Sequence, residues 1–107
     1  MDQLHDSLRV SMDIVLANPY YPWNRQSLSN NRNIDMRVIL IDLPNATGTW
    51  SWYHISKHID MNDVRIHRIR PWNRDGLSRN PGITLDIVND VYMPNASGHW
   101  DWDIMNV

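Results

Sequence analysis

The chain has 107 residues and a mass of 12.7 kDa, which is enough for one small domain with a single core. Hydrophobic residues make up 42% and charged residues 21%, which is a globular rather than a disordered composition. The net charge of −2 argues against a broad basic surface, and the absence of cysteine excludes disulfides, cysteine-based zinc sites and thiol nucleophiles.

The first residues, MDQLHDSLRVSMD, do not resemble a signal peptide, because no basic segment is followed by an apolar stretch. No run in the chain approaches the roughly 18 apolar residues of a membrane-spanning helix. We therefore expect an intracellular protein that is not secreted and does not enter a membrane.

The two halves of the sequence repeat each other at an offset of 49–50 residues. The tetrapeptide PWNR at Pro22 recurs at Pro71, and the nonapeptide PNATGTWSW at Pro44 recurs as PNASGHWDW at Pro94. Each half divides again into two units that begin with a tryptophan. These leading tryptophans are Trp23, Trp50, Trp72 and Trp100. Such regular spacing predicts a repeat protein.

A short helix is predicted directly after each leading tryptophan. The next residue is of a type that caps helix N-termini, and an apolar residue lies four positions after the cap. A tryptophan before the cap and an apolar residue at this spacing form a hydrophobic staple. The caps are Asn24, Ser51, Asn73 and Asp101, and their apolar partners are Leu28, Ile55, Leu77 and Met105. The pattern predicts helices over residues 25–30, 52–57 and 74–79.

A second helix is predicted later in each unit from the same two signals. Its caps are Ser11, Asp35, Asn62 and Thr84, and its apolar staple residues are Val15, Ile39, Ile66 and Val88. The alternating apolar residues in MRVILIDL and ITLDIVNDV are also compatible with strands. We favour helices, because caps and staples agree in all four copies. The staple residues expected to be buried are Leu28, Ile39, Ile55, Ile66, Leu77 and Val88.

These helices predict an all-α fold, a small solenoid of short helical hairpin repeats. We expect a single helical-repeat domain over residues 1–107. A partial unit over residues 1–22 precedes units over residues 23–49, 50–71 and 72–99, and a partial unit over residues 100–107 follows them.

The repeat resembles the tandem Trp-rich repeats of uncharacterised proteins from giant, mimivirus-like DNA viruses of amoebae. The segments WNRDGLSRNPGIT from Trp72 and SMDIVLANPYYPW from Ser11 carry the resemblance. The chain departs from that pattern at Arg25 and Arg74, where the family often has a second tryptophan, and at the PNATG and PNASG inserts. The resemblance implies a viral origin and a location in the host cytoplasm or the virion. It implies no catalytic residues and no cofactor.

His54 and His58 are four residues apart on a predicted helix, a spacing that can present two imidazoles to one metal ion. No third ligand accompanies them, and the equivalent positions in other units are ordinary polar residues. We therefore expect no bound metal. The glycosylation sequons at Asn45 and Asn95 are interpreted as turns, because Asn-Ala-(Thr/Ser)-Gly is common turn chemistry.

The segment RIHRIRPWNR combines arginines with a tryptophan, as in proteins that bind phosphate backbones and stack bases. Its arginines are Arg65, Arg68, Arg70 and Arg74. Aspartates elsewhere in the repeats can pair with them, namely Asp60, Asp63, Asp75, Asp86 and Asp90. Nucleic acid is therefore a less favoured partner.

The third position of the unit alternates between arginine and tryptophan, as Arg25, Trp52, Arg74 and Trp102. Equivalent positions in stacked repeats are neighbours. We therefore expect a ladder in which Arg74 contacts Trp52 or Trp102 through a cation–π interaction. Together with Trp100, these four residues form the predicted interaction surface.

No catalytic motif or phosphate-binding loop stands out, so we do not expect an enzyme. The favoured function is that of a non-catalytic protein-interaction or scaffold protein, either virion-associated or an adaptor toward a host protein. Solenoid ends need polar outer faces, yet the C-terminal unit contains Trp102 and Ile104. We therefore expect a protein partner or self-association through this unit. The alternative is a ligand-binding module that holds polysaccharide or nucleic acid on tryptophan and arginine surfaces.

Overall fold

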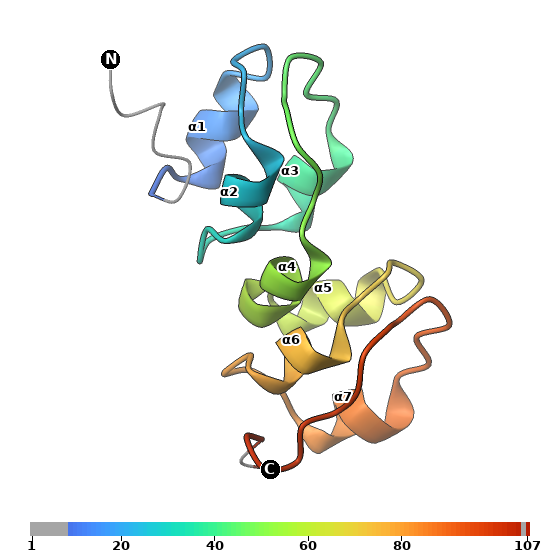
Figure 1. The fold of residues 1–107 in the computed structure, drawn as a ribbon. Helices are drawn as coiled ribbons and strands as arrows, with labels where there is room; N and C mark the ends of the chain where they lie inside the picture. The colour runs from blue at the N-terminus through green and yellow to red at the C-terminus, as the bar shows by residue number, and fades with distance from the viewer. Residues whose placement is uncertain (1–8, 106) are drawn as a thin grey trace. The chain divides into compact units, whose positions relative to one another are not determined.

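The computed structural model describes residues 9–105 and residue 107 and contains seven short α-helices within them. Figure 1 shows these helices joined by long loops, and the described residues form no strand beyond two isolated bridges. The all-α fold is therefore confirmed. The start of the predicted partial unit over residues 1–22 lies outside the described residues.

The chain divides into two compact units, the first of which reaches Ser51, while the second runs from Trp52 to Val107. The first unit contains α1 (Met12–Ala17), α2 (Arg25–Ser29) and α3 (Met36–Leu40). The second contains α4 (Trp52–His58), α5 (Met61–Ile66), α6 (Arg74–Ser78) and α7 (Leu85–Asp90). Within them, α1 packs against α3 and α4 packs against α6.

The predicted helices that follow the leading tryptophans are confirmed as α2, α4 and α6. Their asparagine caps work as expected, since the Oδ1 of Asn24 accepts from the amide of Ser27 at 2.9 Å. The Oδ1 of Asn73 accepts from the amide of Gly76 at 2.8 Å in the same way. Each cap satisfies an amide that the first helical turn leaves without a partner. A further single turn begins at Asp101, whose carbonyl accepts from Met105 at 3.1 Å.

The second helix of the third copy begins two residues earlier than predicted. Its cap is Asp60 rather than Asn62, because the Oδ1 of Asp60 accepts from the amide of Asn62 at 2.7 Å. Both residues are of capping types, so the sequence offered two registers. The fold uses the register that places Ile59, only 1% exposed, before the cap.

Burial of the staple residues follows the prediction in the first helices and at Val15 of α1, and departs from it in the other second helices. Leu28, Ile55 and Leu77 are fully buried. Ile66 is 72% exposed, because the earlier start of α5 rotates Val64 into the core instead.

In α3 and α7 the predicted staple residues Ile39 and Val88 are half-buried. The side chains that enter the core there are Val38 and Ile87, three residues after the cap rather than four. The prediction that Ile39, Ile66 and Val88 are buried is therefore wrong. Short helices have room for one or two core contacts, and the facing elements select which residue makes them.

Two leading tryptophans form the centres of the units. Trp23 and Trp72 are fully buried. The indole Nε1 of Trp23 donates to the carbonyl of Asn18 at 2.8 Å, and that of Trp72 donates to the carbonyl of His67 at 2.8 Å. Each ring therefore contributes a large apolar surface without leaving its N–H group unsatisfied.

Buried serine and asparagine side chains connect consecutive segments of backbone. The hydroxyl of Ser78 donates to the carbonyl of Arg74 at 2.7 Å and accepts from the amide of Asp101 at 2.9 Å. The Nδ2 of Asn80 donates to the carbonyls of Ser56 and Ile59 at 2.9 and 2.8 Å. In the first unit, Ser29 and Asn31 bond to backbone in the same way.

Candidate functional site

Arg74 and its equivalent Arg25 hold the loops that carry the PNASG and PNATG inserts. The Nη1 of Arg74 donates to the carbonyls of Ala96 and Gly98 at 3.5 and 3.3 Å. Arg25 donates to Ala46, Gly48 and Leu43 in the first unit, at 3.3, 3.2 and 3.4 Å. One planar guanidinium can reach several carbonyls at once, so each arginine fixes the whole loop.

The inserts are turns, as predicted. Gly98 has a φ of 77° and Gly48 a φ of 73°, in the left-handed region that glycine adopts without steric cost. The side-chain amide of Asn95 donates to the carbonyl of Ile69 at 2.6 Å, and that of Asn45 donates to Tyr20 at 2.6 Å. The sequon asparagines therefore tie each insert to the preceding loop.

The predicted arginine–tryptophan ladder is wrong within residues 9–105. Neither Arg25 nor Arg74 forms a cation–π contact with an indole, since both guanidiniums face loop carbonyls. Trp52 instead lies edge-to-face against the buried Trp72, with ring centroids 5.4 Å apart and an interplanar angle of 89°. Carbonyl oxygens offered these arginines stronger partners than an indole face.

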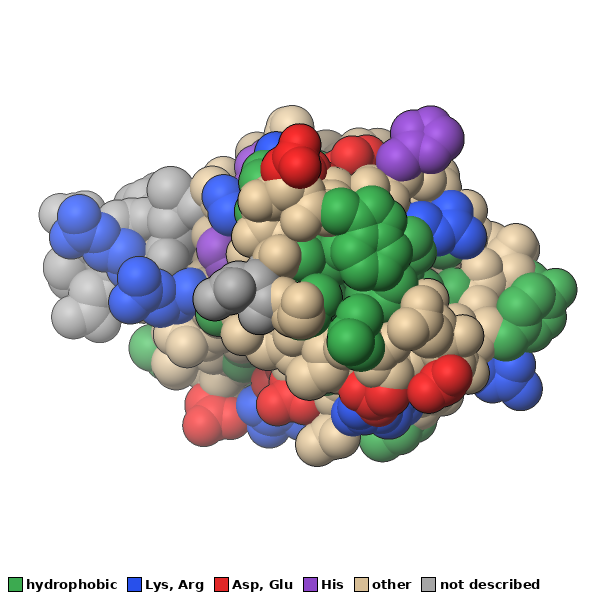
Figure 2. All heavy atoms as spheres, turned by 90° about the horizontal axis from the view of Figure 1, so that it is seen from below, with side chains coloured by type: hydrophobic (Ala, Val, Ile, Leu, Met, Phe, Trp, Pro, Cys, Tyr) green, Lys and Arg blue, Asp and Glu red, His purple; other side chains and the backbone are tan. Residues whose placement is uncertain are grey.

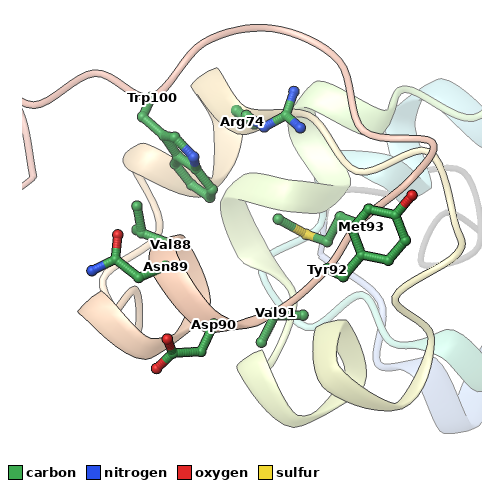
Figure 3. A pocket seen from close by; sticks show the side chains of 8 residues that line it. All are labelled: Arg74, Val88, Asn89, Asp90, Val91, Tyr92, Met93 and Trp100. Carbon is green, nitrogen blue, oxygen red and sulfur yellow. The ribbon is translucent and has the colours of Figure 1, made fainter.

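Arg74 and Trp100 share a hollow of about 290 Å³ in the second unit, which we call the Arg74 hollow. Its lining residues are Arg74, Val88, Asn89, Asp90, Val91, Tyr92, Met93 and Trp100. In Figure 3 the indole of Trp100 points toward Val88, whereas Asn89 and Asp90 lie on the side away from Arg74. The Arg74 hollow thus combines an indole and a buried methionine with one basic side chain, Arg74, and one acidic side chain, Asp90.

The C-terminal segment exposes three apolar side chains, which we call the end face. Trp102 is 56% exposed, Ile104 46% and Val107 48%. Figure 2 shows hydrophobic side chains gathered on the surface that is seen from below. A second hollow of about 190 Å³, the end hollow, adjoins this segment. It is lined by Ser78, Arg79, Asn80, Pro81, Ile83, Ile104, Met105 and Val107.

The four arginines of the segment RIHRIRPWNR have different surroundings in the structure. Arg65 forms an ion pair with Asp86, and Arg74 holds the insert loop. Arg68 is exposed and Arg70 is half-buried. Two of the four guanidiniums therefore already have partners within the second unit.

Asp86 also shapes the start of α7. The side chain of Thr84 does not cap the helix and instead donates its hydroxyl to the Oδ1 of Asp86. The Thr84 hydroxyl, followed by the Arg65 guanidinium, holds the pKa of the Asp86 carboxyl below its ordinary value. Hydrogen bonds to the charged form of a carboxylate favour that form.

His54 and His58 lie half-buried on α4, and the ring of His54 stands edge-to-face to Tyr53 at 5.1 Å. Within the described part of the chain, no three side chains of histidine, aspartate or glutamate gather as metal ligands would.

No protein-family model matches this chain, and the comparisons with curated proteins and with solved structures found no significant match either. The resemblance to Trp-rich repeats of giant viruses stays a prediction. Among residues 9–105 and 107, no helix is long and apolar enough to span a lipid bilayer.

Sequence reasoning identified Arg74, Trp100 and Trp102 but not what surrounds them. The Arg74 hollow is lined in part by the end of α7, which is one residue longer than α3. The extra residue of α7 lies in the region where the repeat offset changes from 49 to 50.

Proposed function

We propose that this chain is a non-catalytic helical-repeat module of the solenoid type that binds other proteins. We further propose a giant-virus origin, with a place in the virion or as an adaptor in the host cytoplasm. The observation that carries the proposal is a contrast between two sets of side chains, those that recur in both units and those that differ. Polar side chains that recur between the two units bond to the chain's own backbone, whereas several of the large exposed side chains differ between the units.

The recurring set includes the asparagine cap, arginine, serine and asparagine positions, each of which has an equivalent backbone partner in both units. The exposed set varies at equivalent places. Tyr20 and Ile69, which are 72% and 61% exposed, each give a carbonyl to a sequon asparagine. Ile66, 72% exposed, stands where α1 has Ala17. Repeat proteins that bind partners combine a constant scaffold with such variable surface positions.

Affinity capture followed by mass spectrometry tests this proposal, with the purified chain as bait in lysate from virus-infected amoebae. The matched control is a bait with Ile66→Asp and Ile69→Asp, two exposed positions of the second unit. We expect a specific protein to be enriched on the wild-type bait and largely lost from the variant. Equal capture by both folded baits would contradict binding through the variable surface.

The Arg74 hollow favours a second candidate, a ligand-binding module. An indole beside polar groups of both charges is a lining that can stack a sugar ring or a base and hydrogen-bond its edges. Titration with N-acetylglucosamine oligomers and with single-stranded nucleic acid, followed by tryptophan fluorescence, tests it. Binding that is lost in Trp100→Phe but kept in Trp102→Phe would support this candidate. Unchanged tryptophan fluorescence with both ligands would reject it.

A further inference from the structure

We propose that the segment RIHRIR over residues 65–70, which we call the arginine strip, binds an acidic segment of another protein. The strip covers the end of α5 and the loop that follows it. The inference rests on the proposed role as a protein-interaction module and names the chemistry of its partner. It starts from the equivalent segment of the first unit, LANPYY over residues 16–21.

The two segments have the same backbone contacts. In each unit the carbonyl of the third residue accepts from the indole Nε1 of the buried tryptophan at 2.8 Å. The same carbonyl accepts from the amide of the last residue, at 3.2 Å for Tyr21 and 3.0 Å for Arg70. The carbonyl of the fifth residue accepts from a sequon asparagine at 2.6 Å in both units. The fold therefore forms this segment equally well with and without charged side chains.

The side chains of the two segments differ in charge. LANPYY contains no charged residue, whereas the arginine strip contains three arginines and no acid. These arginines stand where the first unit has an uncharged side chain, with Arg65, Arg68 and Arg70 in place of Leu16, Pro19 and Tyr21. Like charges close together on a chain repel each other, so such a cluster costs stability unless it is neutralised.

The second unit neutralises the arginine strip only in part. Arg65 forms an ion pair with Asp86 of α7. Among residues 9–105 and 107, no carboxylate forms an ion pair with Arg68 or Arg70. Arg68 is exposed and Arg70 is half-buried. Two cations are thus left for carboxylates from outside the chain.

Two exposed isoleucines lie between these cations. Ile66 is 72% exposed and Ile69 is 61% exposed, and Arg68 stands between them in the sequence. A partner segment that alternates carboxylates with apolar side chains would remove the isoleucines from water and pair with the arginines. Charge complementarity therefore selects an acidic segment with apolar residues of its own.

The exposed side chains favour a protein partner over nucleic acid. Proteins hold single-stranded nucleic acid by stacking bases on exposed aromatic rings. The tryptophan beside the strip, Trp72, is fully buried and its N–H group is bonded to the chain itself. Ile66 and Ile69 offer no planar ring. The net charge of −2 also disfavours a long polyanion, whereas a short acidic segment meets only the local positive charge.

Fluorescence polarisation of labelled peptides tests the arginine strip with the full chain. The probe is a short peptide of Glu-Glu-Leu repeats, and the matched controls are peptides of Gln-Gln-Leu and Lys-Lys-Leu repeats. We expect the Glu-Glu-Leu peptide to bind more tightly than either control and to weaken as salt is added, because salt screens exposed charges. Absence of binding, or equal affinity for the Gln-Gln-Leu peptide, would overturn the proposal.

A charge reversal locates the binding site. Arg68→Glu should weaken binding of the Glu-Glu-Leu peptide by about fivefold or more, the upper range for one exposed charge pair. The variant should fold, because the equivalent position in the first unit is Pro19, and circular dichroism checks this. The matched control is Arg32→Glu, the same charge change at an exposed arginine of the first unit. Equal weakening by the two variants would overturn the assignment to the strip.

Two other polyanions complete the test. Single-stranded oligothymidine and vesicles of phosphatidylserine are added as competitors of the Glu-Glu-Leu peptide. Tighter binding of either one would assign the strip to nucleic acid or to a membrane surface and overturn the proposal. Capture of a protein through Ile66 and Ile69 without binding of the acidic peptide would leave the protein-interaction role intact and reject the acidic partner. The two proposals can therefore fail separately.

Discussion

Gly76 of α6 lies so close to the backbone carbonyl of Tyr53 in α4 that a Cβ on Gly76 would stand 2.3 Å from that oxygen. The same Cβ would meet the Cβ of Ser56 at 3.0 Å. The two helices of this pair can therefore approach each other only because residue 76 has no side chain. The approach brings the hydroxyl of Ser56 to the amide of Asn73, which donates to it at 2.9 Å.

Gly76→Ala should destabilise the fold by about 1–3 kcal/mol or more, because the added methyl group meets backbone that cannot rotate away. Gly82→Ala is the matched control, since its Cβ would make only ordinary contacts of 3.4 and 3.5 Å and its φ is not in the left-handed region. We expect Gly82→Ala to be neutral or to stabilise by about 0.4–1 kcal/mol. Urea unfolding measures both, and equal effects would contradict the close approach of α4 and α6.

Leu77→Ala should reduce the free energy of unfolding by about 2–5 kcal/mol, because Leu77 is fully buried and its truncation leaves a cavity. Ile66→Ala should change it by less than about 0.5 kcal/mol, the usual range for surface positions, since Ile66 is 72% exposed. Both residues were assigned to the core by the sequence pattern. Similar losses at the two positions, measured by urea unfolding, would refute the register of α5.

The first helices could be predicted because three independent signals coincide there. Trp72, Asn73 and Leu77 supply the staple and the cap, and each signal is local, so it does not depend on what the helix packs against. At the second helices the signals conflicted. Asp60 and Asn62 both cap well, and only the burial of Ile59 decides between them.

The roles of the arginines could not be read from the repeat. Spacing placed Arg74 near tryptophans, but its guanidinium bonds to carbonyls of a loop more than 20 residues away. The hollow beside it is lined in part by the end of α7, which the repeat pattern does not place next to Arg74. Long-range contacts of this kind follow from packing, which local patterns do not specify.

Asn80→Ala should cost about 1–3 kcal/mol for each buried carbonyl that it leaves without a donor. The carbonyls of Ser56 and Ile59 both depend on the Nδ2 of Asn80, which is only 5% exposed. Asn89→Ala, an exposed position on α7, is the control and should have little effect. Thermal unfolding compares them, and a loss below about 0.5 kcal/mol at Asn80 would show that water replaces its bonds.

Arg74→Lys should destabilise the second unit by about 1 kcal/mol, because one ammonium group cannot reproduce the reach of a planar guanidinium. The loss is small because Arg74 is only half-buried and water screens part of its interaction with the loop. Amide hydrogen exchange gives a local measure, since the amide of Ser97 donates to the carbonyl of Trp72 at 3.0 Å in the loop that Arg74 holds. We expect faster exchange at Ser97 in Arg74→Lys and none of this change in Arg68→Lys, an exposed arginine. Unchanged exchange in both variants would show that the loop holds without the guanidinium.

Acid should weaken the second unit partly through Asp86. The hydrogen bond from Thr84 and then the guanidinium of Arg65 lower the pKa of the Asp86 carboxyl in the folded state. A carboxyl with a lowered folded pKa stabilises the fold above its unfolded pKa of about 3.9, and this contribution is lost as the pH falls from there through the folded pKa.

The effect is small, because Asp86 is exposed to solvent and its ion pair with Arg65 is screened by salt. We expect Asp86→Asn to be slightly less stable than the wild type at neutral pH and to lose less stability as the pH falls below about 3.9. Asp103→Asn removes an exposed carboxylate that neither Thr84 nor Arg65 contacts, so it should keep the wild-type pH dependence. Urea unfolding at a series of pH values separates the variants. Parallel curves for Asp86→Asn and the wild type would mean that the carboxyl ionises alike in the folded and unfolded chain.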